Sequence, residues 1–129
     1  MEQKSKELLI KDLCARLHYG VKCKILETNE VKILGAIQYD GENTLFDFWE
    51  DDQKIKYGYQ LYLSEFKPCL LPISSMTEEQ KSQYSFFLTR IIDGYDSSLL
   101  IDWLNKNHFD YRGLIERGLA IDATDKNIY

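Results

Sequence analysis

Two stretches of alternating apolar residues decide the fold: Val21-Lys22-Cys23-Lys24-Ile25-Leu26 and Val31-Lys32-Ile33-Leu34-Gly35-Ala36-Ile37-Gln38-Tyr39. In the first stretch, Val21, Cys23 and Ile25 occupy every second position, which is typical of a strand with one buried face. In the second, we expect one face to carry the set Val31, Ile33, Gly35, Ile37 and Tyr39. The polar segment Thr28-Asn29-Glu30 suits a tight turn, so the two strands are predicted to pair.

Further strands are predicted on the C-terminal side of this pair. Asp40-Gly41-Glu42-Asn43 has the composition of a turn, and alternating apolar residues follow at 45–49 and at 55–63. Gly35 is expected to mark a bulge or a sharp bend in the second strand, because an isolated glycine weakens a regular strand.

The segment 66–73 closes the predicted sheet. It contains Pro68 and Pro72, which cannot donate backbone hydrogen bonds, so we expect an edge strand or an extended crossing segment. The region of about 20–73 is thus predicted to be an antiparallel meander of about four to five strands. Its curvature could make it barrel-like.

An amphipathic helix is predicted before the sheet, at about 5–18. Leu9, Leu13 and Leu17 recur at four-residue spacing, which places them on one face. The other face carries the polar side chains Lys6, Lys11, Asp12 and Arg16. Gly20 offers a stop, because glycine accepts the left-handed conformation that ends helices.

Two more helices are predicted after the sheet, at about 77–93 and 97–107. Thr77 and Gln80 have the spacing of a capping box, and an apolar stripe follows at Tyr84, Phe87, Leu88 and Ile91. The tail, 108–129, is expected to be irregular and to fray at its end. This order of elements predicts a single α+β domain, 1–129, whose helices cover one face of the sheet.

The composition restricts the class of protein. The 129 residues carry a net charge of −5, which disfavours nucleic-acid binding and is compatible with a basic protein partner. The three cysteines are widely spaced without a C-x-x-C pair, and apolar runs are short, so we expect a reducing cytoplasm and no membrane span. Only two histidines are present, which excludes a multi-histidine metal centre. A site of one histidine with carboxylates is conceivable, but we predict no metal site, and no motif predicts a cofactor.

The densest group of polar side chains follows the last predicted helix, in Asn107-His108-Phe109-Asp110-Tyr111-Arg112. In an extended chain, His108, Asp110 and Arg112 would face the same side. A carboxylate between an imidazole and a guanidinium could bind a ligand or orient a base. The alternative is a local Asp110–Arg112 pair that pins the C-terminal segment against the helices. We take His108, Asp110, Tyr111 and Arg112 as candidate binding residues and assign no catalytic residue.

Aromatic residues of the predicted sheet form a second candidate surface, with Trp49, Tyr57 and Tyr59 as its binding residues. Exposed strand aromatics can stack nucleic-acid bases or anchor a protein contact, whereas core packing would account for at least half of the series. Cys14 and His18 are four residues apart and could share a helix face. A buried, structural role is predicted for Cys14, because it adjoins the apolar stripe.

Three motifs carry a resemblance to known sequences: Lys11-Asp12-Leu13-Cys14-Ala15-Arg16-Leu17 with Tyr19-Gly20-Val21; Lys67-Pro68 through Pro72-Ile73-Ser74-Ser75-Met76-Thr77-Glu78-Glu79; and Asp102-Trp103-Leu104 through His108-Phe109-Asp110-Tyr111-Arg112-Gly113-Leu114-Ile115. Over nearly the whole chain, they resemble a group of small uncharacterised proteins from gut-bacterial genomes, often encoded in prophage-like or mobile regions, with no assigned activity. The resemblance implies an intracellular, phage-associated setting and supplies no catalytic residue. A proline common at the position of His18 argues against an essential role for that residue.

These observations favour a non-enzymatic protein-binding or adaptor module. Two alternatives stay open at this point: a nucleic-acid or nucleotide binder that uses the sheet aromatics, and a small enzyme centred on His108, Asp110 and Arg112. The partner and the oligomeric state are not indicated by the sequence.

Overall fold

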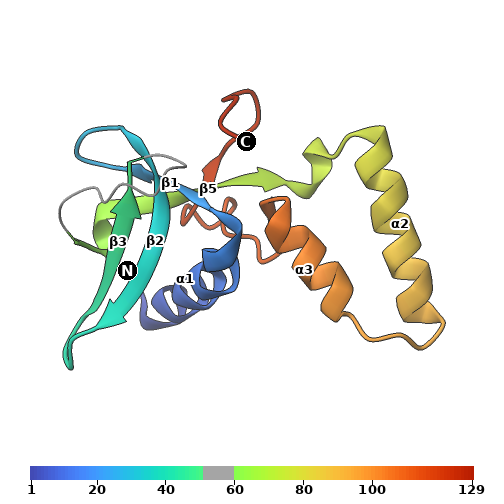
Figure 1. The fold of residues 1–129 in the computed structure, drawn as a ribbon, viewed down its shortest axis with the longest axis horizontal. Coiled ribbons are helices and arrows are strands. Elements are labelled where there is room, and N and C mark those ends of the chain that lie inside the picture. The colour runs from blue at the N-terminus through green and yellow to red at the C-terminus, as the bar shows by residue number, and fades with distance from the viewer. Residues whose placement is uncertain (51–59) are drawn as a thin grey trace.

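The computed structural model describes residues 1–50 and 60–129 and has the predicted α+β class (Figure 1). The helices are α1 (Gln3–Arg16), α2 (Glu78–Ile92) and α3 (Ser98–Lys106). The strands are β1 (Lys22–Ile25), β2 (Val31–Tyr39), β3 (Thr44–Trp49), β4 (Leu61–Tyr62), β5 (Phe66–Pro72), β6 (Phe109–Asp110) and β7 (Ile121–Asp122). Short 3-10 helices lie at η1 (Leu17–Tyr19), η2 (Leu63–Glu65) and η3 (Ile73–Ser75).

The strands of the described chain form one sheet in the order β4-β3-β2-β1-β5-β6, with β7 also paired to β5. β1 and β2 pair antiparallel, which confirms the predicted neighbours, and β3 and β4 continue the antiparallel series. β4 and β6 end the path, so the sheet is open and not a barrel. Of the strand predicted at 55–63, only the part from residue 60 onwards lies within the described residues.

The expected irregularity at Gly35 is present as a shift of register in the β2–β3 pairing. Leu34 lies opposite Phe48, but Ala36 lies opposite Asp47, so one residue of β2 is extra. Because of the extra residue, each side chain of β2 after the bulge points to the sheet face opposite to the one that strict alternation would predict. The prediction that Ile33 and Ile37 share a face is therefore wrong: Ile37 pairs with buried Phe46, and Ile33 pairs with Trp49.

The expectation that the proline-containing segment lies at an edge is also wrong. β5 pairs antiparallel with β1 on one side and parallel with β6 and β7 on the other. An interior position is possible because β6 and β7 are only two residues long and the amides beside the prolines make the contacts. The Leu71 N–H donates to the His108 carbonyl oxygen at 2.8 Å, and the Leu70 carbonyl oxygen accepts from the Ala123 N–H at 2.8 Å.

The same pairings correct the prediction of an irregular tail. Residues 109–110 and 121–122 form strands, because β5 presents a second hydrogen-bonding edge to them. The expected fraying does not extend to Tyr129, whose hydroxyl accepts from the Lys22 N–H at 2.7 Å and donates to the Cys69 carbonyl oxygen at 2.8 Å. The C-terminal segment is thus part of the sheet.

The larger core lies between α1 and one face of the sheet. Leu9 and Leu13 of α1 are buried there, as their spacing predicted, together with Val21, Cys23, Ile25, Leu34, Phe46, Phe48, Phe66, Leu70 and Leu114. The Phe66 ring packs edge-on against Phe46 and Phe48, with centroids 5.0 and 4.9 Å away. We call α1 and the strands the sheet lobe.

The helices α2 and α3 form an arm that extends beyond the end of β5, with α3 nearer to the sheet lobe (Figure 1). Of the three helices in the described residues, α1 alone therefore covers the sheet face, in contrast to the prediction for all helices. A smaller core of Met76, Leu100, Leu104 and Phe109 joins the arm to β6, with Tyr84, Phe87, Ile91 and Trp103 packed around it. The capping box at Thr77 and Gln80 is confirmed, with N–H to side-chain oxygen distances of 2.9 and 3.1 Å.

Candidate functional site

A buried ion cluster lies where α1 meets the C-terminal segment. The Arg16 Nε donates to Asp12 Oδ2 at 2.8 Å, and Arg112 Nε donates to Asp12 Oδ1 at 3.1 Å. Asp12 and Arg16 have no exposed surface, so the prediction that they occupy a polar face beside Lys6 and Lys11 is wrong for these two. They are buried because the C-terminal segment covers that side of α1, and the Arg16 Nη2 donates to the Phe109 carbonyl oxygen at 2.6 Å.

Tyr111 completes this cluster. Its hydroxyl donates to Asn105 Oδ1 at 2.9 Å and accepts from Arg112 Nη2 at 3.0 Å. Its ring lies 5.3 Å from the Arg16 guanidinium carbon, within the range of a cation–π contact. Tyr111 and Arg112 therefore fasten the C-terminal segment to α1.

Asp110 is not part of this ion cluster and instead binds backbone N–H groups. Its two carboxylate oxygens accept from the Leu114 and Ile115 N–H groups at 3.0 and 2.9 Å, and so order the turn before β7. Asp110 and Arg112 have different partners and do not form the local pair of the alternative prediction. His108, Asp110 and Arg112 do not form a shared site on one side of the chain either, because the three side chains contact different partners.

His108 lies in a different setting, against the C-terminal residue. Its backbone has φ of 64°, a left-handed value that only a few per cent of non-glycine residues adopt, with asparagine, aspartate and histidine over-represented among them. Its ring stacks on Tyr129 with centroids 3.7 Å apart and planes 12° from parallel. Burial, with the charges of Arg16 and Lys22, lowers the pKa of His108 from 6.5 to about 4, so the ring is neutral near pH 7. Its Nδ1 is buried with no hydrogen-bond partner among the described residues.

A pocket of about 520 Å³ opens beside His108. Its lining comes from η1, β1, β2, β3 and the C-terminal segment: Leu17, His18, Tyr19, Gly20, Lys22, Ile33, Gly35, Trp49, His108 and Tyr129. Two of the predicted binding residues, Trp49 and His108, are thus brought together, whereas Asp110, Tyr111 and Arg112 do not line this pocket. The predicted residues Tyr57 and Tyr59 lie outside the described residues. We call this the aromatic pocket.

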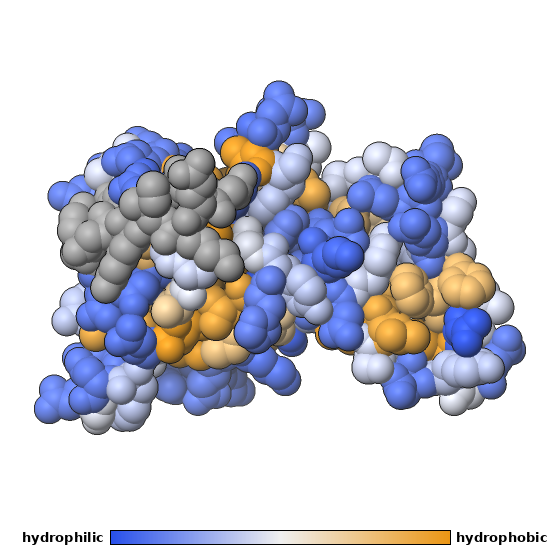
Figure 2. All heavy atoms as spheres, in the orientation of Figure 1, coloured by the Kyte–Doolittle hydropathy of each residue, from blue (hydrophilic) through white to orange (hydrophobic). Residues whose placement is uncertain are grey.

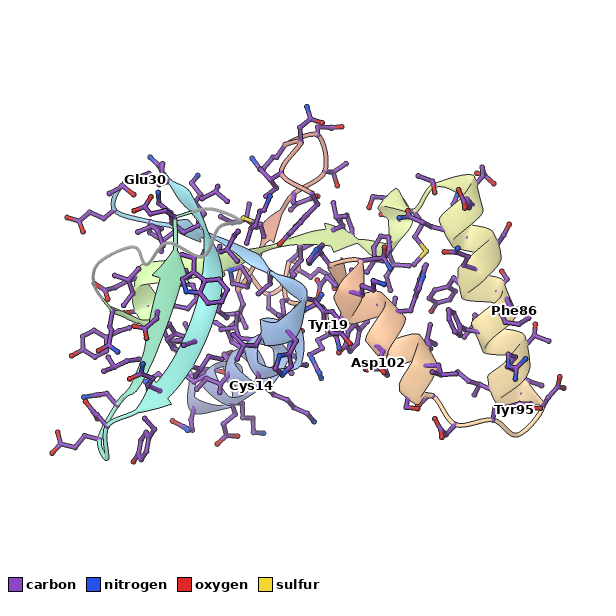
Figure 3. All side chains as sticks on the ribbon, in the orientation of Figure 1. Cys14, Tyr19, Glu30, Phe86, Tyr95 and Asp102 are labelled. Carbon is purple, nitrogen blue, oxygen red and sulfur yellow. The ribbon has the colours of Figure 1, made fainter. Side chains whose placement is uncertain are left out.

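The floor of the aromatic pocket depends on the bulge. A Cβ on Gly35 would come within 2.6 Å of the Trp49 ring, so the indole lies directly on the glycine backbone. The stacked pair of His108 and Tyr129 also lines this pocket. Tyr19 lies where the chain leaves α1 (Figure 3), and it is a further lining residue of the same pocket.

The aromatic pocket has a basic character in an acidic chain. Lys22 is its fixed cation: Nζ donates to the Ile128 carbonyl oxygen and lies 5.7 Å from the centre of the Tyr129 ring. None of the lining residues within the described part of the chain is acidic. Burial also raises the pKa of Tyr129, so its hydroxyl stays protonated and keeps donating to Cys69.

The arm carries a second candidate surface, which we call the arm patch: Phe86, Phe87, Arg90, Tyr95 and Trp103. Phe87 packs on Trp103 with centroids 5.8 Å apart, and Phe86 packs on Phe87 at 6.2 Å. The Arg90 guanidinium lies over both the Phe86 ring and the Tyr95 ring, 5.4 and 4.3 Å from their centres. A shallow hollow of about 320 Å³ lies between Phe86, Phe87 and Trp103.

The arm patch is open to solvent. Phe86 is 58% exposed and Tyr95 59% exposed, and both lie at the outer side of the arm (Figure 3). Figure 2 shows hydrophobic side chains gathered over α2 and α3, separated from the apolar surface of the sheet lobe by polar residues. None of the residues of α2, all of which the structure describes, is buried.

The remaining candidates do not form a site in the described chain. Cys14 is exposed, so its predicted burial is wrong: the helix turns it away from Leu9 and Leu13. Among residues 1–50 and 60–129, no three His, Cys, Asp or Glu side chains lie close enough together to hold a metal ion. No helix in these ranges is both long and apolar enough to cross a membrane.

Comparison of the chain with models of known protein families, with curated proteins and with solved structures gives no significant match. The aromatic pocket and the arm patch therefore have to be interpreted from their own chemistry.

Proposed function

We propose that this protein is a non-enzymatic protein-binding module, an adaptor whose contact surface is the arm patch. The resemblance to small proteins of prophage-like and mobile regions suggests a bacterial, phage-associated setting in the cytoplasm. The observation that carries the proposal is that α2, a 15-residue helix, has exposed apolar side chains and no buried residue.

Exposure of these side chains has a cost that a partner would remove. Burying a large apolar side chain is worth about 1.5–3 kcal/mol relative to leaving it in water. Phe86 and Tyr95 belong to the arm patch, and Leu88, Ile92 and Leu99 are further exposed apolar residues of the arm. Clustered exposed apolar residues are typical of protein contact surfaces, and aromatic residues with arginine are the usual anchors.

The arm patch also indicates the chemistry of its partner. The hollow of about 320 Å³ between Phe86, Phe87 and Trp103 suits one large apolar side chain. Arg90 lies one helical turn from Phe86, and among the described residues no carboxylate lies within ion-pair distance of it. A guanidinium that lies over aromatic rings can still donate its N–H groups to a carboxylate. We infer a protein segment with an apolar anchor and an acidic residue about one turn away.

The test is a pull-down from cells that encode the protein, made with the wild type and three variants. We expect the wild type to capture one protein in stoichiometric amount, Phe86→Ser to lose it and Arg90→Glu to retain much less of it. Tyr39→Ser is the matched control, because Tyr39 is an exposed aromatic residue (70%) on β2, far from the arm. The captured protein is then purified and titrated against the same four proteins.

The proposal requires that substitutions in the arm patch weaken binding of the partner and that the control substitution outside it does not. Equal capture by wild type and Phe86→Ser, or co-purification of nucleic acid in place of a protein, would contradict it. Sedimentation of the purified chain decides a further alternative: a dimer that Phe86→Ser disrupts would make the occupant a second copy, and the adaptor proposal would fail.

A further inference from the structure

We propose that the sheet face directed away from α1 binds an acidic, extended segment of a protein partner through a group of lysines. The group consists of Lys22 and Lys24 on β1, Lys67 on β5 and Lys126 in the C-terminal segment, and we call it the lysine patch. It is a second contact surface, separate from the arm patch, and it does not depend on the function proposed for the arm.

The strand pairing places two of these lysines directly side by side. Lys24 is the register partner of Lys67, and opposite residues of an antiparallel pair have their side chains on the same face, with Cβ atoms about 4.5–5.5 Å apart. Lys22 lies two residues before Lys24 on β1 and so points to the same face. Cys23, between them, is buried in the larger core under α1. The three lysines therefore point away from α1.

Lys126 reaches the same region from the C-terminal segment. Cys69 lies two residues after Lys67 on β5, and its neighbour Leu70 belongs to the larger core, so the Cys69 thiol faces away from α1 as well. Burial raises the pKa of this thiol, and the charges of Lys126 and Lys24 act against the rise. Both ammonium groups are thus near Cys69, one from β1 and one from the C-terminal segment.

The positive charge of the lysine patch is not balanced by ion pairs within residues 1–50 and 60–129. The ion pairs found there join other groups and involve none of the four lysines. Lys22 donates to the Ile128 carbonyl oxygen, which carries no net charge. Hydrogen bonds from Thr124 lower the pKa of the nearby Asp122, to which the charge of Lys126 adds a smaller effect. Asp122 is thus held by Thr124 and forms no ion pair with Lys126.

The arrangement of the lysine patch is unfavourable in the free protein. Like charges directly opposite each other on two strands are destabilising, and this applies to Lys24 and Lys67. Both side chains are half-buried, which lets their stems pack on the sheet while their ammonium groups reach water, and Lys126 is exposed. An anionic partner would remove the repulsion between them. The patch is also local, because the chain as a whole has a net charge of −5.

The charge and the spacing of the lysine patch favour an acidic protein segment over a nucleic acid. A nucleic acid would extend beyond the four lysines onto a protein whose total charge is negative, whereas a short acidic segment need cover only the patch. Lys22 and Lys24 are separated by about 6.8 Å along their strand, which is also the spacing of alternate side chains in an extended peptide. The matching ligand has Asp or Glu at alternate positions of an extended stretch.

The lysine patch and the arm patch lie on different parts of the molecule. Lys67 is near the start of β5, whereas the arm extends beyond the end of this strand (Figure 1). The two surfaces share no residue. A protein with both can hold two different segments at the same time, which is what an adaptor requires.

The experiment is an NMR titration of the full chain at low salt with three probes: an octapeptide of alternating Glu and Ser, the same peptide with Gln in place of Glu, and an oligothymidylate of equal length. We expect saturable binding of the acidic peptide, with shifts of backbone amides in β1 and β5 and none in α2. The Gln peptide should bind at least about tenfold more weakly, because the charge-assisted contacts are lost. The oligothymidylate should also bind more weakly than the acidic peptide, whose affinity should fall as salt is added.

A charge reversal separates binding from a structural role. Lys67→Glu should weaken the acidic peptide by about tenfold or more. It should also raise the melting temperature by about 1–4 °C, because an opposite-charge pair with Lys24 replaces a like-charge pair. Lys24→Gln, which removes one charge without reversing it, should weaken the peptide by about threefold or more and keep the protein folded.

Two further variants serve as controls. Lys4→Glu makes the same change in net charge as Lys67→Glu, at an exposed position on α1, and should alter the affinity for the acidic peptide by less than about twofold. Phe86→Ser removes an anchor of the arm patch and should not alter it at all.

Three results would overturn the proposal. The first is a lack of saturable binding of the acidic peptide by the wild type. The second is equal weakening by Lys67→Glu and Lys4→Glu, because net charge alone would then explain the binding. The third is tighter binding of the oligothymidylate than of the peptide, which would make the ligand a nucleic acid. None of these titrations uses the partner captured by the arm patch, so the two proposals can fail independently.

Discussion

The sheet lobe and the arm bury their apolar residues to very different extents. In the sheet lobe, Phe46, Phe48 and Leu13 have no exposed surface, and segments far apart in the chain enclose them. In the arm, two helices that are neighbours in the chain share one small core, and α2 has no buried residue. A long-range core closes completely, whereas a helical pair covers only the facing stripe of each helix. The stability of the chain should therefore depend mainly on the sheet lobe, whereas the arm leaves much of its apolar surface exposed.

The largest expected effect comes from breaking the ion cluster that closes the sheet lobe. Asp12→Asn keeps the shape of the side chain and removes the negative charge between Arg16 and Arg112. Removing one member of a buried ion pair typically costs about 3–5 kcal/mol, because the remaining charge is left uncompensated. Urea denaturation followed by circular dichroism measures the loss. Lys11→Gln, exposed on the same helix, is the control and should be neutral. A loss below 1 kcal/mol for Asp12→Asn would contradict burial of the cluster.

The second prediction compares one truncation in each region. Leu13→Ala removes a fully buried side chain of the sheet lobe and should lower the free energy of unfolding by about 2–5 kcal/mol. Ile92→Ala removes a side chain of α2 that is 83% exposed and should change it by no more than about 0.5 kcal/mol. Equal effects in urea denaturation would mean that the two regions do not differ as described.

The alternating strands, the α1 stripe and the capping box of α2 could be predicted, because each depends on residues close together in the chain. Gly35 was correctly identified as an irregular position, but the local sequence does not say how many residues a bulge adds. For the same reason, the prediction of the sheet face on which Ile37 lies is wrong. The interior place of β5 could not be predicted, since it depends on two short strands about 40 and 50 residues away.

The candidate site was predicted only in part, for a similar reason. Trp49 and His108 were identified as separate candidates, and nothing in the sequence places them around one pocket. Lys22 and Tyr129 are not among the predicted binding residues, because a lysine that alternates with apolar residues in a strand and a tyrosine in the tail have no local signal of a site. The pair Asp12 and Arg16 did offer a signal that was missed: opposite charges four residues apart on a helix, directly beside Leu9 and Leu13.

The third prediction concerns His108, which lies where the chain returns from the arm to the sheet lobe. In the folded protein, burial and the charges of Arg16 and Lys22 lower the pKa of His108 to about 4. In the unfolded chain its pKa is near the ordinary value of 6.5. As the pH falls from about 6.5 to about 4, the unfolded chain takes up a proton that the folded chain does not. Stability should therefore fall by up to about 3 kcal/mol over this range, less any screening by solvent at the partly exposed ring.

His108→Asn isolates this effect, because asparagine accepts a left-handed backbone and does not titrate. The variant loses the stacking on Tyr129 and should be less stable than the wild type at pH 7. Its stability should nevertheless fall less steeply below pH 6.5, as measured by urea denaturation at half-unit steps. Parallel curves for the two proteins would show that His108 does not contribute the pH dependence.

The smallest effect should be confined to the arm. Thr77→Ala removes the side-chain oxygen that accepts from the Gln80 N–H, and loss of such a cap typically costs about 1 kcal/mol. Because α2 contributes no buried residue, we expect faster hydrogen exchange in the first turns of α2, by about fivefold, and unchanged exchange in β2. Thr89→Ala makes the same substitution at an exposed position near the C-terminal end of α2, where alanine favours the helix and exchange in the first turns should not accelerate. If Thr77→Ala accelerates exchange in β2 as much as in α2, the arm and the sheet lobe unfold together, and the difference in burial does not make the arm an independent contact surface.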